Sequence, residues 1–333
     1  MTCFAYVMSE MDIEPIHTSI RLWVTYESAR LFMEFSIQFI LIALAPVFLL
    51  CVLAEFLYLR PRRHMVSARY SWIDTLSNGT LALLHEISDA LFNSLFVMAV
   101  YFALHEYRLF DIEVSVLSFI GLFLMQDFCY YWFHRAHHRI RYMWASHVVH
   151  HSSEHLNLST AFRQSFTYPV SGMWLFWVPI VLIGFEPELV LGSVLLSLAY
   201  QFFVHTQTIG KLGFLELIFN TPSHHRVHHS RNPEYIDKNY AGILIIWDKL
   251  FGTFVEEKDE LPCEYGITRQ IQSHNPIYLT LHEWQDMFKD VFSGNKTLWQ
   301  RLSHIWRPPE WQPQQNTEHN ADLENPDKKP SQA

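Results

Sequence analysis

The sequence predicts an all-α integral membrane protein, in which four or five membrane helices carry a cytosolic helical cap that holds a histidine-rich di-metal site. Three observations lead to this fold class. Half of the 333 residues are hydrophobic and only 17% are charged, which is more apolar than an average soluble domain. Several apolar runs approach the length of a bilayer-spanning helix. Half of the 20 histidines fall in three short boxes that follow these runs.

The first two apolar runs lie in the N-terminal third. Residues 1–34 form a mixed, amphipathic segment, and the almost uncharged run 35–54 then has the ~20 residues that span a hydrocarbon core. It begins too late and is too long for a signal peptide, so we expect a retained anchor. The second run, 90–104, has a polar extension over 81–89. It is expected to cross as a tilted helix or to dip in and return.

Three further runs complete a predicted membrane-embedded oxygenase domain over residues 35–256. The run 114–133 is one continuous apolar stretch, whereas the runs 168–185 and 189–204 are separated by Glu186, Pro187 and Glu188. That interruption predicts a tight helical hairpin. Residues 206–256 have the pattern of a helical segment outside the bilayer, interrupted by glycine and proline.

The C-terminal part has a different composition. Residues 257–306 are predicted to be a helical extension, with helices over 276–292 and 298–306. From residue 307 the chain is rich in proline, glutamine, asparagine, aspartate and lysine and poor in apolar residues. Such a composition cannot bury enough apolar surface to fold, so residues 307–333 are predicted to be a disordered tail.

Charge asymmetry predicts how the spans are oriented. Basic residues follow the first, third and fifth runs, whereas the opposite ends are acidic or neutral, and basic loops face the cytoplasm. All three histidine boxes are therefore expected at the cytoplasmic face, of either a bacterial inner membrane or the endoplasmic reticulum. The residues behind this orientation are Arg60, Arg62, Arg63, Arg69, Arg135, Arg139, Arg141 and Lys211 on one side, and Glu106, Asp111, Glu113, Glu186 and Glu188 on the other.

Composition also excludes some functions. The net charge of −9 argues against a nucleic-acid partner, which would favour a basic surface. The four cysteines, Cys3, Cys51, Cys129 and Cys263, show no paired spacing, so neither a disulfide framework nor a zinc-thiolate site is expected. The sequence leaves the oligomeric state open.

The histidine boxes have the spacing of metal ligands. His134 and His138 are neighbours on one helical face. Residues 147–151 and 225–229 both read H-x-x-H-H, so one helix can offer imidazoles to two metals side by side. With His205 at the end of the fifth run there are nine candidate ligands, too many for one metal ion: His134, His138, His147, His150, His151, His205, His225, His228 and His229.

The donor set indicates the kind of metal. Imidazole suits zinc, iron, copper and nickel alike. A closed structural zinc site often uses cysteine, and none lies near the boxes. The His-Glu-x-x-His pattern of zinc proteases and the Glu-x-x-His pairs of soluble di-iron bundles are both absent. By elimination, an all-histidine dinuclear site at a membrane face favours iron and O₂ chemistry.

Histidines outside this spacing are more often satisfied polar residues than ligands. His137 and His155 lie close to the boxes but outside the pattern, and His224 flanks the third box, where it either ligates metal or only hydrogen-bonds. The ordinary polar role is assigned to His17, His64, His85, His105, His274, His282, His304 and His319.

Aromatic and acidic residues near the boxes are candidates for supporting roles. Tyr131 and Trp132 belong to an aromatic run before the first box, which either forms an interfacial belt or lines the path of an acyl chain. Asp127 precedes His134 by about two turns and is expected to accept a hydrogen bond from a ligand histidine, as metal-bound imidazoles require. Asp237 and Asp248 are further candidates for that role.

The order H-x-x-x-H, H-x-x-H-H and H-x-x-H-H resembles the fatty acid hydroxylase/sterol desaturase superfamily. The resemblance is carried by residues 127–138 (DFCYYWFHRAHH), 143–165 (MWASHVVHHSSEHLNLSTAFRQS) and 215–254, which contain NTPSHHRVHH and IDKNYAGILIIWDKLFGTF. It covers roughly residues 110–256. Within the superfamily the chain is most similar to a branch that hydroxylates ether lipids.

The resemblance implies two iron ions and a monooxygenase that hydroxylates a lipid C–H bond with O₂ and two external electrons from a separate donor. In that branch the attacked carbon lies next to the ether oxygen, and tetrahydrobiopterin is the reductant. Candidates for supporting the ligands or binding the lipid headgroup are Asn157, Arg163, Asn239 and Tyr240. The guanidinium of Arg163 either pairs with a lipid phosphate, which its geometry suits, or is a positive-inside anchor before the fourth span.

One position departs from that branch, which carries a glutamate directly after the second histidine of the first box, where this chain has Arg139. Pterin dependence and ether specificity therefore stay open for this chain. Two other functions also stay open: a lipid desaturase of the same superfamily and a histidine-ligated, metal-dependent lipid hydrolase. The lipid could be an alkylglycerol, a fatty acyl amide, a sterol or an aminolipid.

Overall fold

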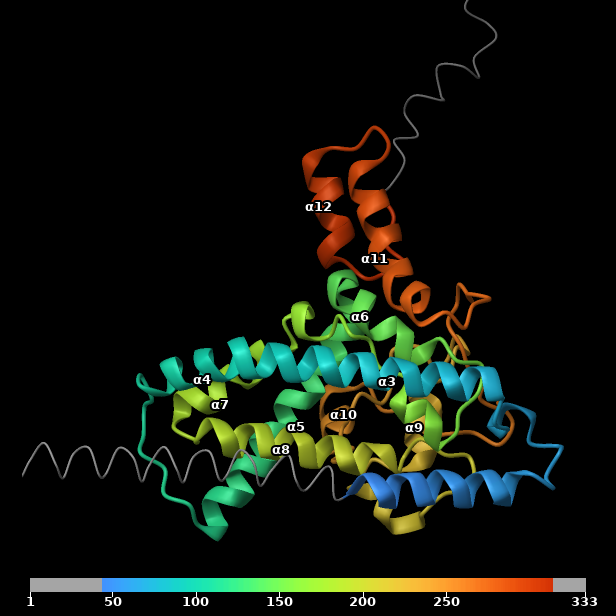
Figure 1. Ribbon diagram of the computed structural model, residues 1–333, viewed down its shortest axis with the longest axis horizontal. Helices are drawn as coiled ribbons and strands as arrows, with labels where there is room; N and C mark the ends of the chain where they lie inside the picture. The colour runs from blue at the N-terminus through green and yellow to red at the C-terminus, as the bar shows by residue number, and fades with distance from the viewer. Residues whose placement is uncertain (1–43, 314–333) are drawn as a thin grey trace, which may run out of the picture.

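The computed structural model describes residues 44–313, and most of their regular structure is helical (Figure 1). Within this range the only β pairing consists of two isolated bridges, Phe219 with Leu244 and Ser230 with Tyr265. Residues 1–34, the start of the first predicted span and the tail from residue 314 lie outside the described part. The longer helical elements, in order, are Leu44–Leu59, α3 (Trp72–Phe92), α4 (Met98–His105), α5 (Val116–Arg139), α6 (Arg141–His151), α7 (Val178–Ile183), α8 (Pro187–Phe202), α9 (Pro222–His228), α10 (Ile246–Phe251), α11 (Pro276–Phe292) and α12 (Leu298–Trp306).

The second apolar run belongs to a much longer helix than the sequence predicted. Residues 72–105 are helical throughout, with a π-helical segment at Asn93–Val97 joining α3 to α4, and at 1.5 Å per residue this rod is ~50 Å long. In its N-terminal part, before the polar extension 81–89, the polar residues Asp74, Ser77 and Asn78 are buried against the protein. This stretch and α5 are the two described helical stretches long and apolar enough to cross a membrane. Four or five crossings remain a prediction.

The prediction of one helix over 168–185 is wrong, although the hairpin itself is present. Gly172 has a left-handed φ of 83° and splits the run into the 3₁₀ turns Pro169–Ser171 and Met173–Trp177. Only the six residues of α7 are then α-helical before the chain turns at Gly184 into α8. Residues 206–256 likewise contain only short helices, the 3₁₀ turn Gly213–Leu217 followed by α9 and α10.

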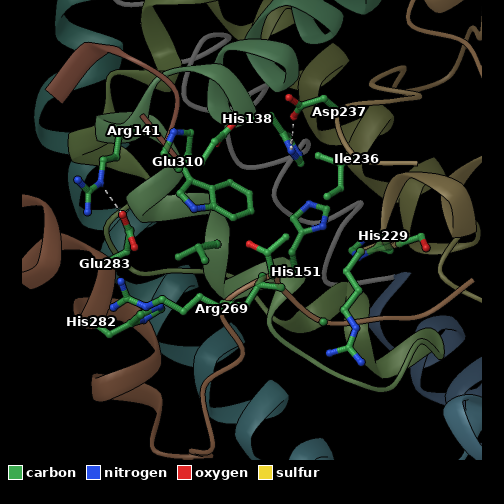
Figure 2. Close-up of a pocket in the computed structure, with 18 of the residues that line it drawn as sticks. His138, Arg141, His151, His229, Ile236, Asp237, Arg269, His282, Glu283 and Glu310 are labelled. Carbon is green, nitrogen blue, oxygen red and sulfur yellow. Dashed lines mark hydrogen bonds and ion pairs between the residues drawn. The ribbon is translucent and has the colours of Figure 1, made fainter. Parts of the chain in front are cut away.

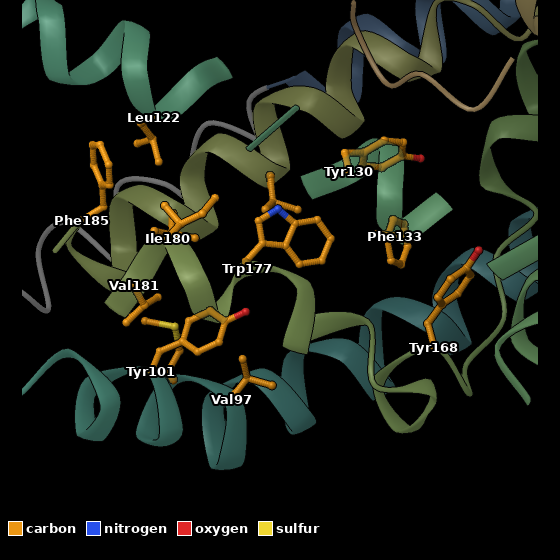
Figure 3. Packing of buried hydrophobic residues seen from close by; sticks show 13 residues of the cluster. Val97, Tyr101, Leu122, Tyr130, Phe133, Tyr168, Trp177, Ile180, Val181 and Phe185 are labelled. Atoms are coloured by element: carbon orange, nitrogen blue, oxygen red, sulfur yellow. The ribbon is translucent and has the colours of Figure 1, made fainter. Parts of the chain in front are cut away.

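Aromatic and aliphatic side chains fill the space between α4, α5, α7 and α8 (Figure 3). Phe133 on α5 packs against Trp177, with ring centroids 5.2 Å apart, and the hydroxyl of Tyr101 on α4 donates to the carbonyl of Trp174 at 2.6 Å. Ser115 begins α5 with a capping box in which its side chain and that of Ser118 satisfy each other's backbone N–H groups. This core fixes α5, which carries the first histidine box.

A second contact region joins α6 to the C-terminal helices, which have the bounds expected from the sequence. Leu81 on α3, Val149 on α6 and Leu279 on α11 are buried in one cluster. The buried guanidinium of Arg141 pairs with Glu283 and Asp290 of α11, both at 2.7 Å. As a result α11 and α12 stand on the side of the molecule where α6 lies (Figure 1). The division of the chain into domains remains a prediction.

Candidate metal centre

The structure brings all nine predicted ligands together in two buried groups. The candidate ligand atoms in each group lie within 4.8 Å of one another. Each H-x-x-H-H segment contributes to both groups, as its spacing suggested. The first group consists of His134, His138, His147, His151 and His228, and the second of His150, His205, His225 and His229.

Sharp changes in chain direction bring the boxes face to face. Ile140 is extended between α5 and α6, so the first two boxes lie on helices that fold against each other, and the rings of His138 and His147 are 4.9 Å apart. Thr221 is extended before α9, and Pro222 occupies the first helical turn, where its missing N–H costs nothing. The third box therefore begins on α9, and its histidines face those of the first two boxes.

Backbone carbonyls set the orientation of several imidazoles. Because a carbonyl can only accept, the ring nitrogen that faces it must be Nδ1–H, and the lone pair of Nε2 is left pointing inward. This applies to His134 donating to Tyr240 at 2.8 Å, His150 to Arg163 at 3.2 Å, His205 to Gln201 at 2.7 Å and His228 to Lys238 at 3.0 Å.

The inward-facing nitrogens fit metal ions. The Nε2 atoms of His150 and His205 are 3.1 Å apart, although the protons of both rings are on Nδ1, so two lone pairs face each other. Nitrogens ~2.1 Å from one metal and at right angles to each other stand ~3 Å apart, so a cation would relieve this repulsion. The buried Nε2 atoms of His138, His228 and His229 have no hydrogen-bond partner among the described residues.

Burial also keeps these rings in the form that binds metal. Desolvation lowers the pKa of His225 and His229 well below the ordinary value and that of His228 to about 4. The imidazoles on α9 are therefore neutral at neutral pH, and a neutral imidazole is the ligating species.

Tyr168 is a site residue that the sequence did not single out. Its hydroxyl is hydrogen-bonded to Nδ1 of His147, and the tyrosine is almost fully buried. It lies in a loop 21 residues after His147, so no short-range sequence pattern links the two residues.

We expect Tyr168→Phe to weaken metal binding in the first group by about 10- to 100-fold, the usual cost of losing the partner of a ligand imidazole. Competition with a chelator, followed by metal analysis, measures the change. Tyr142→Phe, which removes a hydroxyl bonded only to the Val170 carbonyl, is the control. Equal metal affinity in both variants would contradict the role given to Tyr168.

The acidic candidates differ from the prediction. Asp127 bonds no histidine; its carboxylate accepts from the backbone N–H groups of Ile243 and Leu244 at 2.8 and 3.0 Å and from the Trp247 indole at 2.9 Å. Asp248 similarly accepts from the N–H groups of Tyr240 and Ala241. Both carboxylates therefore hold the loop before α10, and through it the carbonyl that orients His134. Expecting them to bond a ligand histidine directly was wrong.

Asp237 does lie beside a ligand. One of its oxygens is 3.9 Å from Nδ1 of His138, and the other pairs with Arg139. Arg139 is thus paired with a carboxylate that lies beside the first histidine group. Asp237 adopts a left-handed φ of 62° to make this arrangement.

The candidates for lipid contact are mostly structural. Arg163 is 1% exposed and pairs with Asp74 at 3.1 Å, so its assignment to a lipid phosphate was wrong. The two asparagines hold loops: Asn157 caps the 3₁₀ turn Leu158–Phe162, and Asn239 donates to the His224 and Val255 carbonyls. Of the aromatic candidates, Tyr131 is hydrogen-bonded to Thr253 and Trp132 packs on Phe251. Tyr240 packs beside the ligands His134, His138 and His228.

The remaining histidines stay outside both groups. His224 is buried against Phe254, and His137 bonds the Phe133 carbonyl and Ser171. The ordinary polar role is seen for His85, which bonds the Ser165 carbonyl, and for His282, which bonds that of Leu279. None of His64, His105, His155, His274 and His304 joins a group either, whereas His17 and His319 lie outside the described residues.

A pocket of about 420 Å³ opens beside the first group (Figure 2). His138, His151 and His228 line it together with Trp144, whose ring centroid is 5.3 Å from that of His138. Its other walls carry many ionisable side chains: Arg141, Arg231, Asp237, Arg269, His282, Glu283, Asp290 and Glu310. Apolar side chains, including Val148, Ile236 and Ile267, line it as well, so the pocket offers contacts to both a polar group and an apolar one.

Comparisons with known proteins agree with this site. Residues 119–253 match the fatty acid hydroxylase family. The chain is 41% identical over 241 residues to human alkylglycerol monooxygenase, covering 72% of this chain and 53% of that enzyme. The zebrafish (Danio rerio) enzyme of the same name is 48% identical over 202 residues, 59% of this chain and 42% of the relative.

A bacterial relative is more distant. Ornithine lipid hydroxylase OlsE of Rhizobium tropici is 30% identical over 152 residues, 46% of each chain. The chain spans about half the length of the alkylglycerol monooxygenases of human and Xenopus tropicalis. No solved structure matches the chain significantly. The family resemblance is confirmed: the chain contains a fatty acid hydroxylase domain, residues 119–253, and this domain holds all nine clustered histidines.

Proposed function

We propose that this chain is a membrane non-haem di-iron monooxygenase that hydroxylates a lipid C–H bond, with the carbon next to an ether oxygen as its target. The observation that carries the proposal is the pair of all-histidine groups, of five and four residues, inside a fatty acid hydroxylase domain. The lipid substrate is suggested by relatives named as lipid monooxygenases and hydroxylases.

The nine histidines would hold two iron ions, which supply the capacity to reduce O₂ with two electrons and transfer one oxygen atom. The overall balance is R–H + O₂ + 2e⁻ + 2H⁺ → R–OH + H₂O. The two electrons come from a separate donor, for which tetrahydrobiopterin is one candidate, and no nucleic acid takes part. The histidine groups are expected at the cytoplasmic face.

The chain's own residues would orient and protect this chemistry. Eight of the nine histidines are buried and His138 is partly exposed at the pocket, which limits the access of bulk water to the centre. The carbonyls of Tyr240, Gln201 and Lys238 hold the rings of His134, His205 and His228 in one tautomer. The pocket gives the first group an opening of mixed polar and apolar lining for part of a lipid or for a soluble reductant, whereas the second group borders it only through His229.

Isotope labelling tests the proposal. Purified protein in lipid nanodiscs, given an alkylglycerol, tetrahydrobiopterin and ¹⁸O₂, is expected to contain two iron ions per chain. The hydroxylated ether carbon is a hemiacetal that breaks down to glycerol and a fatty aldehyde, and the aldehyde, reduced at once with borohydride so that its oxygen does not exchange with water, is expected to carry one ¹⁸O atom. A reductant such as dithionite-reduced ferredoxin replaces the pterin in a parallel reaction. Label taken from H₂¹⁸O with turnover under argon would instead establish a hydrolase, and a new double bond without label would establish a desaturase.

A further inference from the structure

The last described helix, α12, buries polar side chains and exposes apolar ones. Ser303 and His304 of α12 are each 1% exposed, whereas Leu298 and Trp299 are 71% and 62% exposed. Leu302 and Trp306 continue the same outer stripe at helical spacing, at 43% and 44%. A helix that packs on a soluble core has the opposite arrangement.

The end of α11, the other helix of the hairpin, also exposes apolar side chains. Phe288 and Phe292 are 45% and 76% exposed, one helical turn apart, with ring centroids 6.4 Å from each other. We call these six residues of the hairpin its apolar face: Phe288, Phe292, Leu298, Trp299, Leu302 and Trp306. An exposed group of aromatic and aliphatic side chains of this kind marks an interaction site.

The charge of the hairpin suits a lipid surface. Residues 276–307 contain four basic residues, Lys289, Lys296, Arg301 and Arg307, and three acidic residues, Glu283, Asp286 and Asp290, in a chain whose net charge is −9. All three acidic residues are paired with arginines outside the hairpin, Glu283 and Asp290 with Arg141 of α6 and Asp286 with Arg269. The guanidinium of Arg307 lies 4.8 Å from the ring of Trp306, an arrangement that places a cation beside an aromatic ring at the edge of the apolar face. Tryptophan with lysine and arginine is typical of helices that lie in a membrane interface.

The direction of the hairpin agrees with this role. Figure 1 shows α11 and α12 running crosswise to the α3–α4 rod, with α12 on the side of α11 toward α4. The rod is one of the two described stretches able to cross a bilayer. If it does cross, α12 lies along the membrane plane, as an interfacial helix must.

We propose that the apolar face of the α11–α12 hairpin lies in the headgroup region of the bilayer leaflet nearest the histidine groups, with its basic residues at anionic lipid. Glu283 and Asp290 of α11 and Pro309, Glu310 and Gln312 after α12 also border the pocket. The mouth of the pocket would then be at the lipid surface, where a headgroup reaches the first histidine group without leaving the membrane. This consequence, unlike the proposal itself, rests on the proposed function.

Site-specific photocrosslinking tests the contact. The full chain, carrying benzophenone-alanine at Leu302 and reconstituted in nanodiscs of phosphatidylcholine and phosphatidylglycerol, is irradiated and analysed by intact-mass spectrometry. A phospholipid adduct is expected in several-fold higher yield than at Glu260, an exposed loop position, and comparable with Leu83, an exposed apolar position on α3. The same substitution at Trp299 guards against a local failure of α12 to fold.

Two results would overturn the proposal. A chain-to-chain crosslink at residue 302 would mean that a second copy covers the face. Lipid adducts at Leu83 but none at Leu302 or Trp299 would mean that the apolar face is exposed to water. Neither readout depends on iron or on turnover, so the proposed oxygenase activity can fail while this contact holds, and the reverse.

Discussion

Replacing His225 with alanine is expected to abolish hydroxylation, with at least a ~10³-fold loss of product, and to reduce bound metal from two ions to one or fewer. Its Nε2 lies 2.9 Å from that of His205, and its ring is 4.6 Å from that of His229, so the second group would lose one of the two ligands that the third box supplies to it. With four histidines the second group has none to spare.

The neighbouring residue is the matched control. His224 is also a buried histidine on α9, but it lies outside both groups, so His224→Ala should keep both metal ions and most of the activity. Metal analysis and product formation are measured on folded, monodisperse protein for both variants. Loss of metal from His224→Ala, or two ions retained by His225→Ala, would contradict the division of ligands made here.

The sequence predicts those features of the site that depend on residues close together in the chain, and not those that depend on contacts between distant segments. The ligands were predictable because His147, His150 and His151 follow helical geometry within five residues, and α6 adopts that geometry. Their partition into groups of five and four depends on how α5, α6 and α9 fold against one another, which spacing alone does not fix.

Supporting contacts were less predictable because they cross long stretches of chain. Four ligand rings are held by carbonyls, which every residue possesses, so no side-chain pattern marks them. Asp127 was recognised as significant because it is ionisable in an apolar run, but its partners are backbone N–H groups more than 110 residues away. The full length of α3 was not predicted because its polar residues interrupt the apolar pattern. In the fold, Asn78 is hydrogen-bonded to Ser159 and Arg163, partners that the local sequence does not reveal.

Arg163→Met is expected to destabilise the protein by about 3–5 kcal/mol, since it leaves the Asp74 carboxylate buried without its cation. The guanidinium also bonds Asn78 at 2.9 Å, Ser152 at 2.9 Å and the Val149 carbonyl at 2.9 Å, so α3 and α6 both lose a contact. A drop of roughly 6–15 °C in the midpoint of thermal unfolding in detergent follows from that free energy. The Arg163 carbonyl accepts from His150, so weaker metal binding in the second group is expected as well.

A double variant shows whether the buried charge is the cause. Asp74→Asn removes the carboxylate, so the Arg163→Met/Asp74→Asn double variant should be more stable than the sum of the two single changes predicts. Arg231→Ala, which removes a half-exposed guanidinium at 3.6 Å from Glu264, should cost less than about 1 kcal/mol. If Arg163 instead bound a lipid phosphate, Arg163→Met would raise KM at unchanged thermal stability. Because Arg163 is 1% exposed and pairs with a buried carboxylate, we expect the reverse. The variant should be less stable, and the KM for the lipid should be unchanged in the molecules that remain folded.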